Sequence, residues 1–116
     1  MGDKIKCNPV TFGGSTKEGS PYWTFKQKIK DSFNKKIDFD DEVELEIVVY
    51  LLKERIKPGK NDLDNFLKPI IDAIEGILFN SESQISSIYI KRIGVDLKDE
   101  EGIRVLSKIK DVYEND

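Results

Sequence analysis

A stripe of apolar residues between positions 63 and 78 constrains the fold more than any other feature of the sequence. These residues recur at intervals of three and four, at Leu63, Phe66, Leu67, Ile70, Ile71, Ile74, Ile77 and Leu78. That spacing is typical of an α-helix that buries one face. Pro69 lies inside the stripe, and because proline lacks a backbone donor, we expect a kink or a late start near Lys68. The pattern predicts a central helix with an irregular first turn.

Charged residues occupy the opposite face of this helix. At about 100° per residue, that face carries Asp64, Lys68, Asp72 and Glu75. Asn61 and Asp62 come directly before it, and both are favourable N-cap residues whose side chains accept hydrogen bonds from the first turn. A carboxylate at this end is also favoured by the helix dipole. The helix therefore combines a buried apolar stripe with an exposed charged one.

Four other segments have the composition or alternation of β-strands: residues 1–12, 43–51, 84–93 and 103–109. The second segment alternates apolar residues with Glu44 and Glu46 and then becomes apolar on both faces, which predicts a central strand. Pro9 restricts the first segment to an edge of the sheet or to the end of a strand. Between the last two segments, the charged residues 94–102 predict a hairpin loop.

A further helix is expected after Ser20 and Pro21, which suit the N-cap and the first helical position. Its apolar stripe comprises Tyr22, Phe25, Ile29 and Phe33. The element order is then β-α-β-α-β-β. This order predicts an α+β fold in which both helices lie on one face of a mixed sheet. A length of 116 residues suits one domain over residues 1–116.

The composition excludes several kinds of catalytic site. The chain has no histidine and one cysteine, Cys7, which excludes Ser-His and Cys-His pairs, the common zinc sites and a disulfide framework. The remaining catalytic groups are carboxylates and lysines, which favour a hard cation, Mg²⁺ first and Mn²⁺ second. No segment has the pattern of a membrane span or a signal peptide, so we expect a cytoplasmic protein.

Charge is distributed unevenly along the chain. The net charge is −3, but residues 1–60 carry 12 basic and 10 acidic groups, whereas residues 61–116 carry 7 and 12. Four basic residues cluster just before the acidic stretch: Lys53, Arg55, Lys57 and Lys60. A basic strip beside carboxylates suits a phosphate polymer held over a metal ion. Ordinary solvated side chains are the alternative interpretation.

Asp62 and Asp64 cannot hold a catalytic cation by themselves, because Mg²⁺ requires several oxygen ligands. The nearest further acid is Glu82, which follows the central helix. A calcium-binding EF-hand loop is excluded, because Phe66 and Leu67 stand at its third ligand and at its required glycine.

The run Asp62-Leu-Asp-Asn65, followed by Lys68, Asp72-Ala73, Gly76 and Gln84-Ile85, resembles the signature of the RusA family of Holliday-junction resolvases. That signature reads DxDN, K, DA and then DD-x-Q, with Glu82 at the second aspartate of the last element. The resemblance covers about residues 43–93. It implies a homodimeric, Mg²⁺-dependent endonuclease that resolves four-way DNA junctions by paired nicks, in recombination and repair.

The resemblance also implies roles for individual residues. Asp62, Asp64 and Glu82 would bind one or two Mg²⁺ ions, which activate water and neutralise the scissile phosphate. Lys68 would stabilise charge that develops at the phosphorus centre, although a surface ion pair with Asp64 is an alternative role. The basic cluster at residues 53–60 would contact the junction. Two other functions stay open: a RusA-like domain that binds branched DNA or a protein without cutting, and a small interaction domain whose acidic helix faces water.

Overall fold

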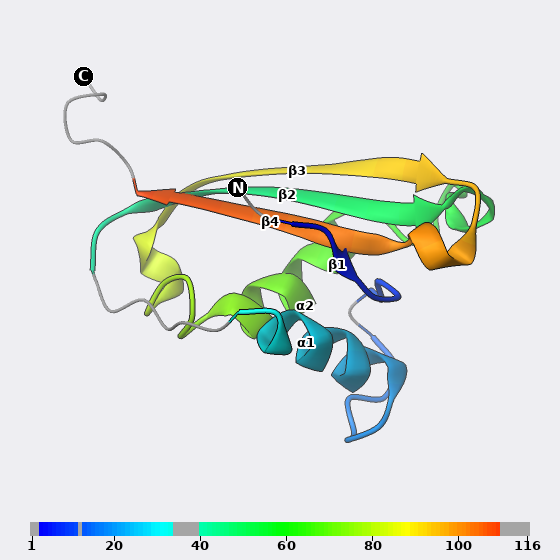
Figure 1. Cartoon of the computed structure of the whole chain (residues 1–116), viewed down its shortest axis with the longest axis horizontal. Helices are drawn as coiled ribbons and strands as arrows, with labels where there is room; N and C mark the ends of the chain where they lie inside the picture. Colours follow the sequence, from blue (N-terminus) through cyan, green and yellow to red (C-terminus); the bar gives the residue numbers. More distant parts are fainter. Residues whose placement is uncertain (1–2, 12, 34–39, 110–116) are drawn as a thin grey trace.

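A four-stranded mixed sheet with the strand order β1-β4-β2-β3 forms the centre of the computed structural model, which describes residues 3–11, 13–33 and 40–109. The strands are β1 (Ile5–Lys6), β2 (Val43–Leu52), β3 (Ile85–Val95) and β4 (Gly102–Ile109). The helices α1 (Pro21–Asp31) and α2 (Asp64–Ile74) lie together beneath one face of the sheet (Figure 1). This arrangement confirms the α+β class and the element order.

The central position predicted for β2 is confirmed. This strand pairs in parallel with β3 and antiparallel with β4. Its alternate residues point into the core beneath the sheet and are buried: Val43, Leu45, Ile47, Val49 and Leu51. Three short 3₁₀ helices complete the described structure: η1 (Lys53–Arg55), η2 (Glu82–Gln84) and η3 (Lys98–Glu100).

The hairpin predicted between β3 and β4 is wrong. β4 lies on the far side of β2 from β3 and pairs with β2 and β1. Ile103 and Val105 of β4 are buried, whereas β3 is largely exposed and takes the edge of the sheet. The connection at residues 96–101, which includes η3, therefore crosses the end of β2. Alternation in a sequence predicts buried faces, but it does not predict which strands pair.

Hydrogen bonds to Glu101 stabilise this crossing. Its side chain is 2% exposed, and its Oε2 atom accepts hydrogen bonds from the Leu52 N–H at 2.8 Å and from Nη1 of Arg55 at 3.0 Å. Nη2 of Arg55 donates to the carbonyl oxygen of Pro9 at 2.8 Å. A buried carboxylate requires such partners, because an unpaired charge in the interior is costly. The Arg55–Glu101 pair thus joins the end of β2, the start of β4 and the N-terminal segment.

The start of α1 agrees with the sequence. Oγ of Ser20 accepts a hydrogen bond from the Trp23 N–H at 3.2 Å, and Pro21 takes the first helical position. The apolar stripe of α1 packs against α2 and the sheet. Cys7 is buried in the same core, where desolvation raises the pKa of its thiol to about 12 and keeps it protonated at neutral pH. Within the described residues, no helix is long and apolar enough to cross a membrane.

Helix α2 departs from the prediction at both ends. It begins at Asp64 and continues through Pro69, so of the two expected alternatives, a kink or a late start near Lys68, the late start is wrong. Leu63 takes the N-cap position without a side-chain hydrogen bond; Asn61 instead donates through Nδ2 to the carbonyl oxygen of Arg55 at 2.9 Å. The helix ends at Ile74, before the apolar stripe does, and the residues beyond it pack against the core from a turn.

Candidate metal centre

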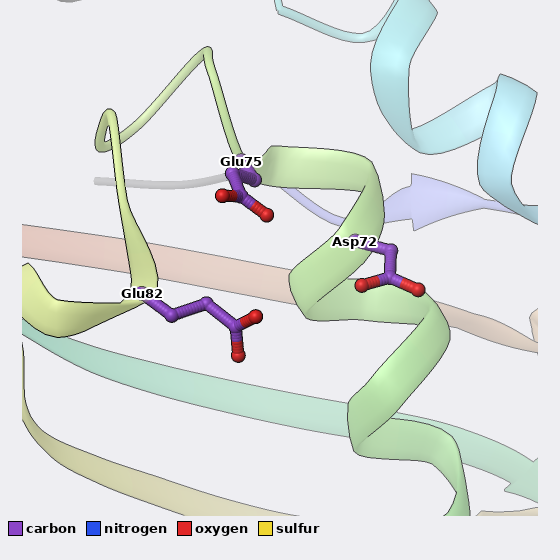
Figure 2. Close-up of side chains that lie close together, drawn as sticks. All are labelled: Asp72, Glu75 and Glu82. Atoms are coloured by element: carbon purple, nitrogen blue, oxygen red, sulfur yellow. The ribbon is translucent and has the colours of Figure 1, made fainter.

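Three carboxylates converge where α2 ends and the chain returns towards β3. Asp72 on α2, Glu75 directly after it and Glu82 in η2 each place a carboxylate oxygen within 4.8 Å of the other two. Figure 2 shows the three side chains directed into a common space, with Glu82 reaching across from the segment that faces the helix. Asp72 is half-buried, whereas Glu75 and Glu82 are exposed. We refer to these three residues as the acid cluster.

The turn after α2 positions Glu75. Its N–H still donates to the carbonyl oxygen of Ile71 at 3.0 Å, but its own backbone is extended, with φ −65° and ψ 134°. Gly76 follows with a φ of +84°, a conformation that residues with a side chain rarely adopt. The Gly76 N–H donates to the carbonyl oxygen of Phe79 at 2.7 Å. Gly76 therefore allows the reversal that brings η2 back to the end of the helix.

Gln84 positions the segment that carries Glu82. Its Oε1 accepts hydrogen bonds from the N–H groups of Asn80 at 2.6 Å and Ser81 at 2.9 Å, and its Nε2 donates to the carbonyl oxygen of Asp41 at 3.0 Å. Gln84 is buried, so these bonds are shielded from water. One side chain thus ties η2 to the chain that enters β2.

A hollow of about 470 Å³ lies beside the acid cluster, between α2 and the start of β3. Its lining combines charged and apolar residues: Asp64, Leu67, Lys68, Ile71, Asp72, Glu82, Ile85 and Ile88. Nζ of Lys68 lies 3.6 Å from Oδ2 of Asp72, one helical turn further along α2. A cation, several carboxylates and four apolar side chains therefore line one depression.

The structure distributes the predicted metal ligands over two places. Glu82 belongs to the acid cluster and to the hollow. Asp64 lines the hollow but lies eight residues before Asp72, about 12 Å away along the helix axis. Asp62 is exposed before the helix and is not part of the hollow's lining. Metal binding by Asp62 and Asp64 stays a prediction.

Asp72 and Glu75 are the acids that sequence reasoning left without a metal role. Helical periodicity placed both on the charged face with Asp64, and that was the signal available. Their approach to Glu82 depends on the turn at Gly76 and on the return of η2 to the helix end. That return is a tertiary contact, which periodicity does not report.

The predicted DNA-binding residues precede α2, at the end of the helix away from the acid cluster, and their environments differ. Lys57 and Lys60 are exposed on the turn around Pro58-Gly59. Nζ of Lys53 pairs with Asp96 at 3.0 Å on the exposed surface. Arg55, in contrast, is engaged by Glu101 and Pro9. Arg55 therefore has a structural role that the sequence did not reveal.

The donor set of the acid cluster fits a hard divalent cation. Carboxylate oxygens are the ligands that Mg²⁺ and Mn²⁺ prefer, and three of them close together repel one another unless a cation neutralises them. Within the described part of the chain, Glu75 and Glu82 form no salt bridge that would do so. The fold and this cluster define an α+β protein with a carboxylate site of the kind that metal-dependent hydrolases use.

Comparison with protein-family models identifies the family. The model described as Endodeoxyribonuclease RusA matches residues 10–106 of the 116-residue chain. The chain therefore belongs to the RusA family, which confirms the resemblance and makes it a nuclease of the endodeoxyribonuclease class. No curated protein matches the chain, and neither does any solved structure.

Proposed function

We propose that this protein is a Mg²⁺-dependent endonuclease that resolves four-way DNA junctions by paired nicks in recombination and repair. The observation that carries the proposal is the convergence of three carboxylates beside Lys68, in a chain of the RusA family. Paired nicks in two strands require two sites. A homodimer supplies them by symmetry.

Two sets of acids compete as ligands, and Glu82 belongs to both. The family motif favours Asp62 and Asp64 with Glu82, whereas the geometry favours Asp72 and Glu75 with Glu82. When bound, the metal would make a water molecule nucleophilic at neutral pH and offset the charge of the scissile phosphate, with Mn²⁺ as a substitute for Mg²⁺. The protein's part is to hold the carboxylates close together and to orient the DNA strand beside them.

Lys68 is the residue best placed to act on the phosphate. It lines the hollow between Asp64 and Asp72, and its ammonium group lies near the acid cluster. There it would stabilise the negative charge that develops on the phosphate oxygens as the phosphodiester bond breaks.

The exposed lysines before α2 would hold the DNA. Lys53, Lys57 and Lys60 are free to exchange solvent or a weak surface pair for phosphate oxygens, and each such contact releases counterions. Arg55 would contribute mainly by fixing the position of this segment through Glu101.

The deciding experiment measures nicking of a synthetic four-way junction in the presence of Mg²⁺. We expect the wild type to cut and Glu82→Gln to be inactive, with Glu18→Gln as a control that removes one exposed carboxylate outside the acid cluster and the hollow. Comparison of Asp64→Asn with Glu75→Gln then distinguishes the two ligand sets. If only Asp64→Asn abolishes nicking, the set with Asp62 and Asp64 binds the metal. If only Glu75→Gln abolishes it, the set with Asp72 and Glu75 does.

A second candidate function is junction binding without cleavage. Glu82, which stands at an aspartate position of the family signature, is the observation that favours it. A wild-type protein that binds the junction but leaves it uncut with both Mg²⁺ and Mn²⁺ would establish this alternative. A protein that binds neither DNA nor Mg²⁺ would instead be an interaction domain.

A further inference from the structure

The face of the sheet opposite the helices carries a group of basic residues around an aromatic ring. The strand register places Val48 of β2 between Lys91 of β3 and Arg104 of β4, and Tyr50 follows on the same face. Figure 1 shows α1 and α2 on the other side of the sheet, so among the described residues no helix covers this face. We refer to Lys4, Lys91 and Arg104, which surround Val48 and Tyr50, as the basic sheet patch.

Two cations converge on the ring of Tyr50. Nζ of Lys4 lies 4.3 Å and Cζ of Arg104 lies 5.8 Å from the ring centroid. Cation–π attraction holds each of them, but two positive charges at this separation repel each other. Lys91 adds a third charge on the same face, and its backbone lies two strand spacings, about 10 Å, from that of Arg104. None of the three forms a salt bridge within the described residues. The patch therefore has a positive charge that an external anion would neutralise.

Arg104 also has an unsatisfied donor. Its Nε is buried and has no hydrogen-bond partner in the described structure. A buried N–H without an acceptor costs free energy, so the side chain is held over Tyr50 by packing and cation–π attraction at the expense of a hydrogen bond. Rotation of the guanidinium towards a bound phosphate would expose Nε to an acceptor and remove that cost.

We propose that the basic sheet patch binds the phosphate backbone of an arm of the DNA, while the hollow beside the acid cluster holds the strand to be cut. This inference rests on the proposed function, because it takes DNA as the substrate. Duplex DNA carries one negative charge per about 1.7 Å of helix axis, so three cations spread over about 10 Å face several phosphates at once. Tyr89 lies on the same face, is 58% exposed and is available to contact a sugar.

A second copy of the chain is the rival occupant, because Glu46 lies beside the patch on the same face. Stacking two sheets face to face would bury the three cations, and removal of charges from water is costly even when they find partners. DNA leaves them at a wet, polar interface, which is the ordinary environment of phosphate contacts. The charge of the patch therefore favours DNA.

The test measures binding of a four-way junction by the full-length protein in EDTA, by fluorescence anisotropy, from about 50 to about 300 mM KCl. Without a divalent metal, cleavage does not enter the measurement. We expect the double variant Lys91→Gln/Arg104→Gln to bind about tenfold more weakly, and the slope of log Kd against log salt to fall by about two, one for each lost phosphate contact. The matched control, Lys17→Gln/Lys98→Gln, removes the same charge from outside the patch and should keep the wild-type slope.

The possible outcomes separate the hypotheses. An unchanged slope and affinity in the folded double variant overturns the proposal, and so does a variant that alters only the oligomeric state in sedimentation, which would assign the face to a second copy. If the double variant does not fold, Lys91→Gln alone, at an exposed position, should still lower the slope by about one. A wild type that binds the junction with the expected slope but does not cut it in Mg²⁺ refutes the proposed cleavage. It does not contradict the proposed DNA binding by the basic sheet patch.

Discussion

Glu101 and Glu82 are two acids of one small protein in opposite circumstances. Glu101 is 2% exposed, at the end of β2, and accepts hydrogen bonds from a backbone N–H and from Arg55. Glu82 is exposed near the start of β2, close to two other carboxylates, and forms no salt bridge within the described residues. The fold pairs the first charge with Arg55, whereas the second has no salt bridge among the described residues.

The contrast distinguishes structural charge from functional charge better than residue type does. A buried ion pair is costly to break, because removal of one partner leaves the other uncompensated. A cluster of exposed like charges is mildly unfavourable by itself, and a bound cation would relieve the repulsion. Substitution of Glu82 should therefore lower activity, whereas a substitution that breaks the Arg55–Glu101 pair should lower stability.

The largest expected effect is on activity. Glu82→Gln should lower junction nicking about a thousandfold, equivalent to about 4 kcal/mol in the barrier, because the neutral amide is a poor ligand for Mg²⁺. Its melting temperature in metal-free buffer should equal or exceed that of the wild type, because one repulsive charge is removed. Single-turnover nicking and thermal unfolding test this. A variant that loses stability as well as activity would place Glu82 with Glu101 and contradict the comparison.

The second effect is on stability. Arg55→Met should lower the free energy of unfolding by about 3 kcal/mol, because the buried Glu101 carboxylate loses its cationic partner. Urea unfolding measures the change, and the variant that remains folded should still cut the junction. Replacing both residues, with Arg55→Met and Glu101→Leu, should recover part of the loss, because no charge then remains buried. A loss below about 0.5 kcal/mol in the single variant would show that the pair is not structural.

Gln84 lies between these extremes, since it is buried like Glu101 but serves the acid cluster. Gln84→Ala removes the hydrogen bonds to Asn80, Ser81 and Asp41 and should cost about 2 kcal/mol of stability. Because Glu82 is then less well positioned, the Mg²⁺ concentration for half-maximal nicking should rise about tenfold. Metal titration separates this from a purely structural role, which would leave the metal dependence unchanged. Ser86→Ala, which removes one hydrogen bond to Val43, is a control in the adjoining strand.

Local signals in the sequence predicted the elements well. The cap of α1 at Ser20, the alternation of β2 and the apolar stripe of α2 each depend on neighbouring residues, and the structure agrees with them. The strand order was not predicted, because it depends on the crossing from β3 to β4 over the end of β2. There Glu101 accepts a hydrogen bond from Leu52, 49 residues earlier in the chain. The crossing places β4 beside β2 from Gly102 to Ile109, and sequence periodicity does not report such long-range pairing.

The candidate site was predictable to a similar extent. Glu82 and Lys68 stood out by spacing and charge, and the structure places both in one hollow. The meeting of Glu82 with Asp72 and Glu75 depends on the positive φ of Gly76 and on the bonds of Gln84. Arg55 was grouped with the lysines because charge alone does not distinguish a cation held by a buried acid from a solvated one. Hydrogen-bond and ion-pair partners distinguish the two kinds of cation, and those partners depend on the tertiary structure.

The smallest effect sharpens the comparison within the basic segment itself. Lys53 and Arg55 are two residues apart, but the Lys53–Asp96 pair is exposed, with 65% and 76% of the two side chains accessible. Lys53→Met should therefore change the free energy of unfolding by less than about 0.5 kcal/mol, against about 3 kcal/mol for Arg55→Met. The same variant should weaken junction binding at low salt and lower its salt slope by about one, if Lys53 exchanges Asp96 for a phosphate. Urea unfolding and anisotropy on the same preparations measure both quantities. The assignment would be reversed if Arg55→Met weakened DNA binding more than Lys53→Met and was as stable as Lys53→Met. Arg55 would then be the DNA contact, and Lys53 would not.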